Sequence, residues 1–123
     1  MTIEQIEKGL VLNLTLAQLV SISCIQELKS FRTVGRITDL LPDGIDEATY
    51  FQLLKIVIES MEFKLDKHIT PIINDANTKI MANKELFSNG LITVFELTQR
   101  QVADLINTIN EVKNLITEHT LNI

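Results

Sequence analysis

Two segments of this chain place apolar residues at alternating intervals of three and four, and no other feature of the sequence constrains the fold as strongly. The first segment carries Phe51, Leu54, Ile58, Met61 and Leu65, and its register continues to His68 and Ile72. The second carries Val102, Leu105, Ile109, Val112 and Ile116. Residues at these intervals fall on one face of an α-helix, as in helical bundles and coiled coils. The pattern predicts two helices, over 47–69 and 99–118, that pack through these faces.

A pattern that marks the start of a helix occurs twice in the chain. Thr15 followed by Gln18 has the pattern of a capping box, which predicts a helix over 16–32. Thr98 and Gln101 repeat the pattern just before the second apolar segment. Two explanations of the shared Leu-Thr-x-x-Gln stay open: a degenerate internal repeat, or one capping solution used twice.

A fourth helix is expected after a break in the first heptad segment. Thr70 and Pro71 suit an N-cap and a first helical position, so the chain should restart or kink there and continue as a helix over 71–85. Residues 10–14 and 91–97 are short, apolar and rich in β-prone side chains, which predicts brief strands. The expected fold is a mainly α, single-domain bundle of about four helices with two short β segments.

Charge and cysteine content exclude several classes of protein. The net charge is −5, with 11 basic and 16 acidic residues, whereas nucleic-acid binding requires many basic side chains to replace phosphate counterions. A single cysteine, Cys24, cannot form an internal disulfide, which favours a reducing, cytoplasmic compartment. Gly9 to Gln26 lacks charge, but Asn13 and Ser21 are among the polar residues that interrupt it. We therefore expect a buried segment there and no membrane span.

Catalytic and metal-binding residues are not expected. Glu59, Glu62 and Asp66 share one side of the predicted helix 47–69, but the chain has no Glu-x-x-His pair of the kind that holds metals in bundles. This carboxylate face is interpreted as solvated. Phosphate-binding loops and nucleophile elbows are also absent from the sequence, so we expect no enzyme activity, no cofactor and no metal.

The supply of apolar residues exceeds what the inner faces of one four-helix monomer require, and such an excess is typical of chains with a protein partner. We expect a homo-oligomer or a multi-subunit assembly. The candidate interface residues are Leu19, Ile22, Ile25, Val94, Phe95, Ile106 and Leu115. The function predicted from this pattern is a small structural or protein-interaction subunit. The alternative is a small acidic inhibitor or immunity-type protein that sequesters one protein partner.

Residues 10–19, Leu-Val-Leu-Asn-Leu-Thr-Leu-Ala-Gln-Leu, resemble the start of short phage-encoded helical proteins, in which a brief strand and a Leu-Thr cap precede an apolar helix. The excess of Ile, Asn and Lys over Arg is similar to that of proteins from AT-rich genomes, including many phages. The resemblance implies a virion or accessory protein, located in the virion or the host cytoplasm, and it implies no functional residues.

Overall fold

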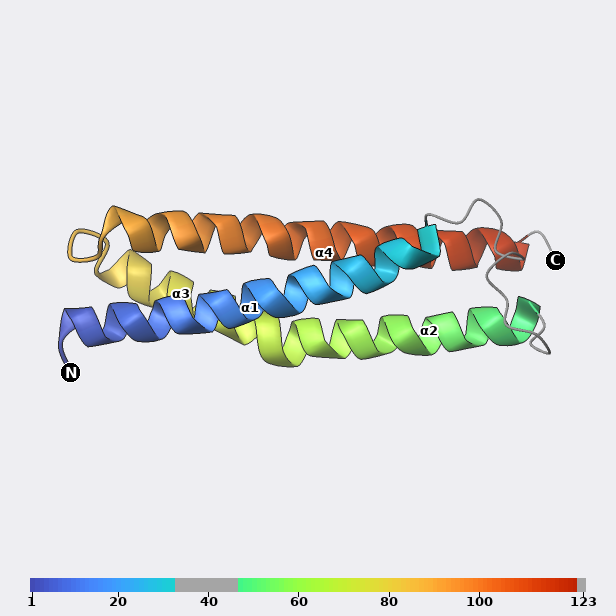
Figure 1. Ribbon diagram of the computed structural model, residues 1–123, viewed down its shortest axis with the longest axis horizontal. Helices are drawn as coiled ribbons and strands as arrows, with labels where there is room; N and C mark the ends of the chain where they lie inside the picture. The colour runs from blue at the N-terminus through green and yellow to red at the C-terminus, as the bar shows by residue number, and fades with distance from the viewer. Residues whose placement is uncertain (33–46, 122–123) are drawn as a thin grey trace.

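The structure is a computed structural model, and it describes residues 1–32 and 47–121. Its elements are α1 (Ile3–Arg32), α2 (Glu47–Lys64), the π-helical turn η2 (Leu65–Ile69), α3 (Thr70–Ala82) and α4 (Asn89–Leu121). Because α2, η2 and α3 follow one another without a gap, the four α-helices form the three rods of a small bundle (Figure 1). The mainly α class is confirmed. The segment between the first two predicted helices, residues 33–46, lies outside the described residues.

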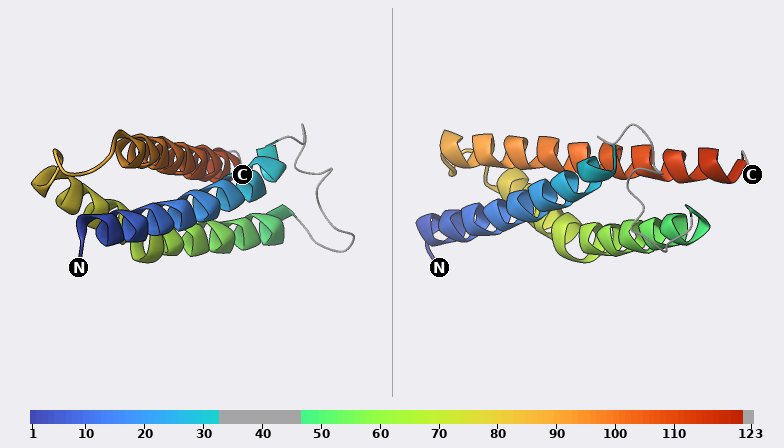
Figure 2. Two further views of the ribbon diagram at one scale, coloured as in Figure 1. Left: turned by 60° about the vertical axis from the view of Figure 1, so that its left-hand side comes forward. Right: turned by 45° about the vertical axis from the view of Figure 1, so that its right-hand side comes forward.

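Helices α1 and α4 run in the same direction, and the bent rod α2–η2–α3 runs back between their ends (Figures 1 and 2). Glu7 on α1 is bonded to Ser88, which lies 81 positions further along the chain. Further along the pair, Gln18 of α1 is bonded to Thr98 of α4, which lies 80 positions later. A nearly constant separation is expected for two parallel helices that pack against each other.

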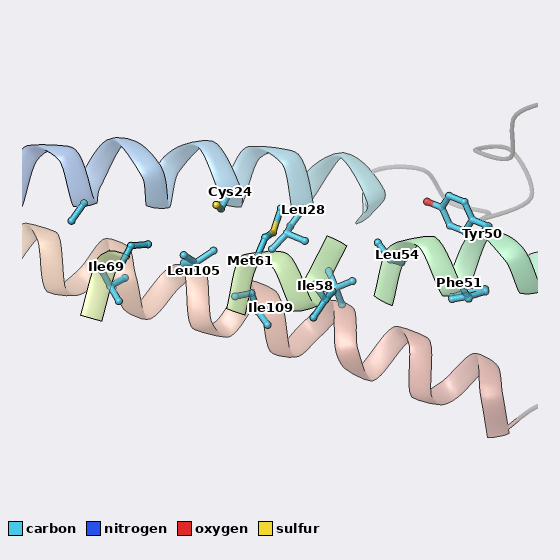
Figure 3. Packing of buried hydrophobic residues seen from close by; sticks show 13 residues of the cluster. Cys24, Leu28, Tyr50, Phe51, Leu54, Ile58, Met61, Ile69, Leu105 and Ile109 are labelled. Atoms are coloured by element: carbon cyan, nitrogen blue, oxygen red, sulfur yellow. The ribbon is translucent and has the colours of Figure 1, made fainter. Parts of the chain in front are cut away.

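The core consists of two clusters along the bundle. In the larger one, Cys24 and Leu28 of α1 meet Met61 of α2 and Leu105 and Ile109 of α4, so that all three rods contribute (Figure 3). The smaller cluster lies at the end of the bundle that holds the N-terminus (Figure 1). It comprises Leu10, Leu14, Ala76, Ile80, Phe87, Leu91 and Phe95. Both heptad faces predicted from the sequence contribute to the larger cluster.

The rod formed by α2 and α3 differs from the predicted heptad after Leu65. The backbone N–H of Thr70 bonds the carbonyl of Leu65, five residues earlier, which closes a π turn. A π turn accommodates one extra residue, so the inward row moves by one position. Ile69 is therefore buried while His68 is exposed, which corrects the predicted register. Pro71 explains the position of the turn, because a proline ring clashes with the carbonyl four residues before it.

Residues 10–14 and 91–97 are helical, and the prediction of strands there is wrong. The described residues contain no strand at all. Helix α1 begins at Ile3, where Thr2 and Gln5 form a capping box: each backbone N–H bonds the other residue's side chain, at 3.0 and 3.2 Å. The predicted start at residue 16 was therefore placed too late.

Helix α4 begins ten residues before its predicted start, and its N-cap depends on α1. The Leu91 backbone N–H bonds Ser88 Oγ at 3.3 Å. Glu7 Oε1 accepts hydrogen bonds from Ser88 N–H at 2.8 Å and from Ser88 Oγ–H at 2.5 Å. An acidic side chain usually completes a capping box from the same helix, whereas here the neighbouring helix supplies it. Ser88 thus begins α4, and the preceding helix α3 ends at Ala82 rather than at residue 85.

One residue of each predicted capping box contacts the other, between α1 and α4. Thr15 and Thr98 each donate to the carbonyl four residues earlier, at 2.8 and 2.7 Å, within continuous helices. Gln18 Nε2 on α1 then donates to Thr98 Oγ1 on α4 at 2.8 Å. The shared Leu-Thr-x-x-Gln pattern therefore supplies a contact between helices and begins neither of them.

Candidate interaction surface

The outward side of α1 carries an exposed apolar row. Leu12, Leu16 and Leu19 are 62%, 49% and 59% exposed, and they are spaced four and three residues apart. The buried row of the same helix, which includes Leu14, Ala17 and Cys24, is spaced in the same way. Because each row occupies one side of the helix, α1 is apolar both toward the core and toward solvent. We call Leu12, Leu16 and Leu19 the α1 outer row.

The α1 outer row differs from the solvent side of the other long helix. No charged residue occurs between Gly9 and Gln26. Helix α4 instead exposes Glu96, Arg100, Asp104, Glu111 and Lys113 over a comparable length. A helix of a soluble bundle normally carries its charges on the side away from the core. Depletion of charge is also what distinguishes the centre of a protein interface from the rest of the surface.

A second group of exposed apolar side chains lies on α2. Leu53, Ile56 and Phe63 are 47%, 61% and 57% exposed. Charged residues accompany them, because Lys55 and Glu59 are exposed on the same helix. The Phe63 ring also meets the His68 imidazole edge to face, with ring centroids 6.1 Å apart. Part of this surface is therefore already used within the chain.

The predicted interface residues do not form one patch. Leu19, Ile22 and Ile106 are exposed, while Ile25, Val94 and Leu115 are partly buried and Phe95 is in the core. Ile106 lies one heptad before Lys113, whose Nζ is 3.5 Å from Glu62 Oε2 of α2, so Ile106 is on the α2 side of α4. Leu19 instead points outward from α1. At 7% exposure Phe95 has no surface to offer in this fold, which corrects its assignment.

Leu12 and Leu16 were missed as surface residues. The predicted helix began at residue 16, which placed Leu12 in a predicted strand, and neither residue was among the predicted interface residues. The Thr2–Gln5 capping box was the signal that could have corrected both, because a helix from Ile3 puts Leu14 and Ala17 in one row with Cys24.

The described residues contain no group of three or more His, Cys, Asp or Glu side chains that could hold a metal ion. Glu62 of the acidic side of α2 is paired with Lys113. Cys24 is 4% exposed, and burial raises the pKa of its thiol, with a smaller lowering by Lys64 and a smaller raising by Glu27. A thiol with a raised pKa is a poor nucleophile at neutral pH.

Among the described helices, α1 alone is long and apolar enough over Ile3–Ser30 to cross a membrane, judged by length and composition. A mostly buried core helix of a soluble protein and a signal sequence near the N-terminus pass the same test, and 28% of the apolar window of α1 is buried. No family model, curated protein or solved structure matched the chain.

Proposed function

We propose that this protein is a small, non-enzymatic structural or protein-interaction subunit of a larger assembly. The observation that carries the proposal is the charge-free outer side of α1, with three leucines about half or more exposed. Fully burying a leucine side chain contributes roughly 1.5–3 kcal/mol relative to leaving it in water. A partner that covers the α1 outer row would recover part of that free energy at each of the three positions.

The distribution of charge favours this function over the acidic inhibitor. An inhibitor that sequesters a basic partner needs acidic side chains gathered on one face. Helix α4 carries four acidic and two basic residues, and α3 carries one of each. Acidic and basic residues are therefore interspersed along α3 and α4. On the acidic side of α2, Glu62 is already paired with Lys113 of α4.

A virion or accessory role in a phage is part of the proposal, with the virion or the cytoplasm as its location. Its support is the resemblance of residues 10–19 to short phage-encoded proteins and the composition of the chain. The brief strand in that resemblance has no counterpart here, because residues 10–19 lie within α1. The proposal therefore rests mainly on the surface of α1.

The test is the composition of the particle that contains this chain in the organism that makes it. The chain, tagged at its C-terminus and expressed at its natural level, is isolated and analysed by native mass spectrometry. We expect a particle heavier than 13.9 kDa with a fixed, whole-number ratio of subunits. A monomer as the only species would contradict the proposal.

A matched pair of variants locates the surface responsible. Leu16 and Leu53 are 49% and 47% exposed and lie on different helices. Leu16→Glu should remove the chain from the particle, while Leu53→Glu should leave it in place. Equal retention of both variants would show that the assembly does not use α1.

A further inference from the structure

We propose that the occupant of the α1 outer row is the same row of a second copy of this chain, with the two α1 helices antiparallel. This inference rests on the proposed function and names its partner. In this arrangement a two-fold axis passes between Leu16 and Leu19, so that Leu16 of each copy packs against Leu19 of the other. The charge of α1, the sizes of the side chains along its outer side and the position of Gly9 all favour this arrangement.

The net negative charge of the molecule lies outside α1. Helix α1 has three acidic residues, Glu4, Glu7 and Glu27, and three basic ones, Lys8, Lys29 and Arg32. The net charge of −5 therefore comes entirely from the rest of the chain. In an isologous interface the same patch faces itself, so any charge at its centre meets an identical charge. A patch that is uncharged from Gly9 to Gln26 avoids that repulsion and keeps the acidic parts of two copies apart.

Side-chain size along the row suits an antiparallel copy. Extended in both directions at the same intervals, the α1 outer row includes Gly9 before it and Ser23 and Gln26 after it. With Leu16 opposite Leu19 of the second copy, Leu12 falls opposite Ser23 and Gly9 falls opposite Gln26. Each level away from the axis thus pairs a smaller residue with a larger one, which is how facing helices interdigitate.

The monomer leaves open space beside Gly9. A Cβ added to it would meet no atom within 4 Å, and the residue is exposed near the beginning of a 30-residue helix. Glycine within a helix costs about 1 kcal/mol relative to alanine, so its presence there requires a reason. Close approach by another helix is a common one, because only glycine leaves room for it. The second copy supplies that helix.

Polar residues in the row favour a protein over a lipid bilayer as the occupant. Ser23 and Gln26 lie in the row itself, and Asn13 is exposed beside it. In hydrocarbon these groups would lose their hydrogen bonds to water without replacement, which costs several kcal/mol each. At an antiparallel helix pair Ser23 and Gln26 lie toward the ends of the contact and Asn13 lies at its edge, where water reaches them.

The test is sedimentation equilibrium of the purified full-length protein from micromolar to submillimolar concentration. We expect the wild type to approach twice 13.9 kDa. Leu16→Glu and Leu19→Glu should each weaken dimerisation more than about tenfold, the equivalent of about 1.4 kcal/mol. Circular dichroism checks that both variants fold, as the exposure of both side chains predicts. Leu53→Glu is the matched control and should dimerise like the wild type.

Two further measurements separate this inference from the alternatives. Oxidation of a mixture of Leu16→Cys and Leu19→Cys proteins should give mainly the mixed disulfide, whereas a parallel pair would give the two homodisulfides. Flotation with neutral phosphatidylcholine vesicles should leave the protein unbound. A monomeric wild type, a parallel pair, or vesicle binding abolished by Leu16→Glu would each overturn the inference. A fixed-ratio particle from the native source combined with a monomeric purified chain would overturn this inference alone and leave the proposed function standing.

Discussion

Gln18 on α1 donates a 2.8 Å hydrogen bond to Thr98 Oγ1 on α4, across 80 residues of sequence. Thr98 is fully buried, and its hydroxyl donates a hydrogen bond to the carbonyl of Val94 at 2.7 Å. This partly buried polar pair disfavours other registers, because a shift would separate Gln18 Nε2 from its acceptor Thr98 Oγ1. The pair thus fixes how α1 and α4 align.

Replacing Thr98 by valine keeps the volume and removes the acceptor of Gln18. We expect the free energy of unfolding to fall by about 1 kcal/mol, the usual net value of one hydrogen bond. Urea denaturation measures it. Thr93→Val is the control, because Thr93 also bonds the carbonyl four residues before it, at 2.9 Å, but is exposed. Equal losses in the two variants would show that the Gln18 bond contributes nothing.

Ser21→Ala should stabilise the protein. The Ser21 hydroxyl is fully buried on α1 and has no hydrogen-bond partner among the described residues. Its removal eliminates an unpaired buried polar group, and alanine also favours a helix more than serine, so a gain of about 1 kcal/mol is expected. Ser60→Ala, at an exposed helical position, measures the helix propensity alone. A gain at Ser21 no larger than that at Ser60 would contradict the prediction.

Deletion of Lys67 should be tolerated. It removes an exposed residue from the π turn, so the rod can continue as an α-helix with Ile69 still facing the core. Deletion of Glu59, exposed in the middle of α2, rotates the following residues by about 100° and moves Met61 out of the core. Thermal unfolding followed by circular dichroism should show a cooperative transition for the first deletion and none for the second. Similar unfolding of the two would mean that the π turn does not set the register.

The contribution of Glu7 to stability should depend on pH. Its side-chain and backbone hydrogen bonds from Ser88 hold the pKa of the Glu7 carboxyl below its ordinary value of 4.5. A carboxyl whose pKa is lowered in the folded state stabilises above the unfolded pKa, and this stabilisation is lost as the pH falls through the folded value. The stability difference between wild type and Glu7→Gln should therefore be present at neutral pH and shrink below pH 4.5.

Glu4→Gln is the control for the pH experiment. Glu4 lies at the same end of α1, and its exposed carboxylate pairs with Lys8 instead of with Ser88. A Glu7→Gln difference that is constant between neutral and acidic pH would show that the carboxylate does not act through its charge.

The heptad rows were predictable from the sequence because they depend only on spacing. Ile58, Met61, Leu105 and Ile109 are all buried as expected. The helix starts were less predictable, because Thr15 and Thr98 satisfy their hydroxyls equally well at a cap or on the carbonyl four residues back. A short apolar run such as residues 91–97 also fits a strand or a buried helix by its sequence alone.

The surface was only partly predictable for the same reason. The predicted interface residues include Leu19 and Ile22, which are exposed, but neither Leu12 nor Leu16. The π turn at Leu65–Ile69 could not be derived from the spacing, because the heptad continues to His68 and Ile72 without a gap. Whether the buried position is residue 68 or residue 69 depends on how this rod packs against the other helices.

The parallel pairing of α1 with α4 has a consequence for synthesis. Helix α1 leaves the ribosome first, but Thr98 is translated 80 residues after Gln18. At a translation rate of about 5–20 residues per second, the part of α4 that contacts Gln18 is synthesised roughly 4–16 s after Gln18 itself. Until α4 has been made, the inner side of α1 can pack only against α2 and α3, which are translated earlier. The part of that side that α4 covers therefore stays exposed on the nascent chain throughout the interval.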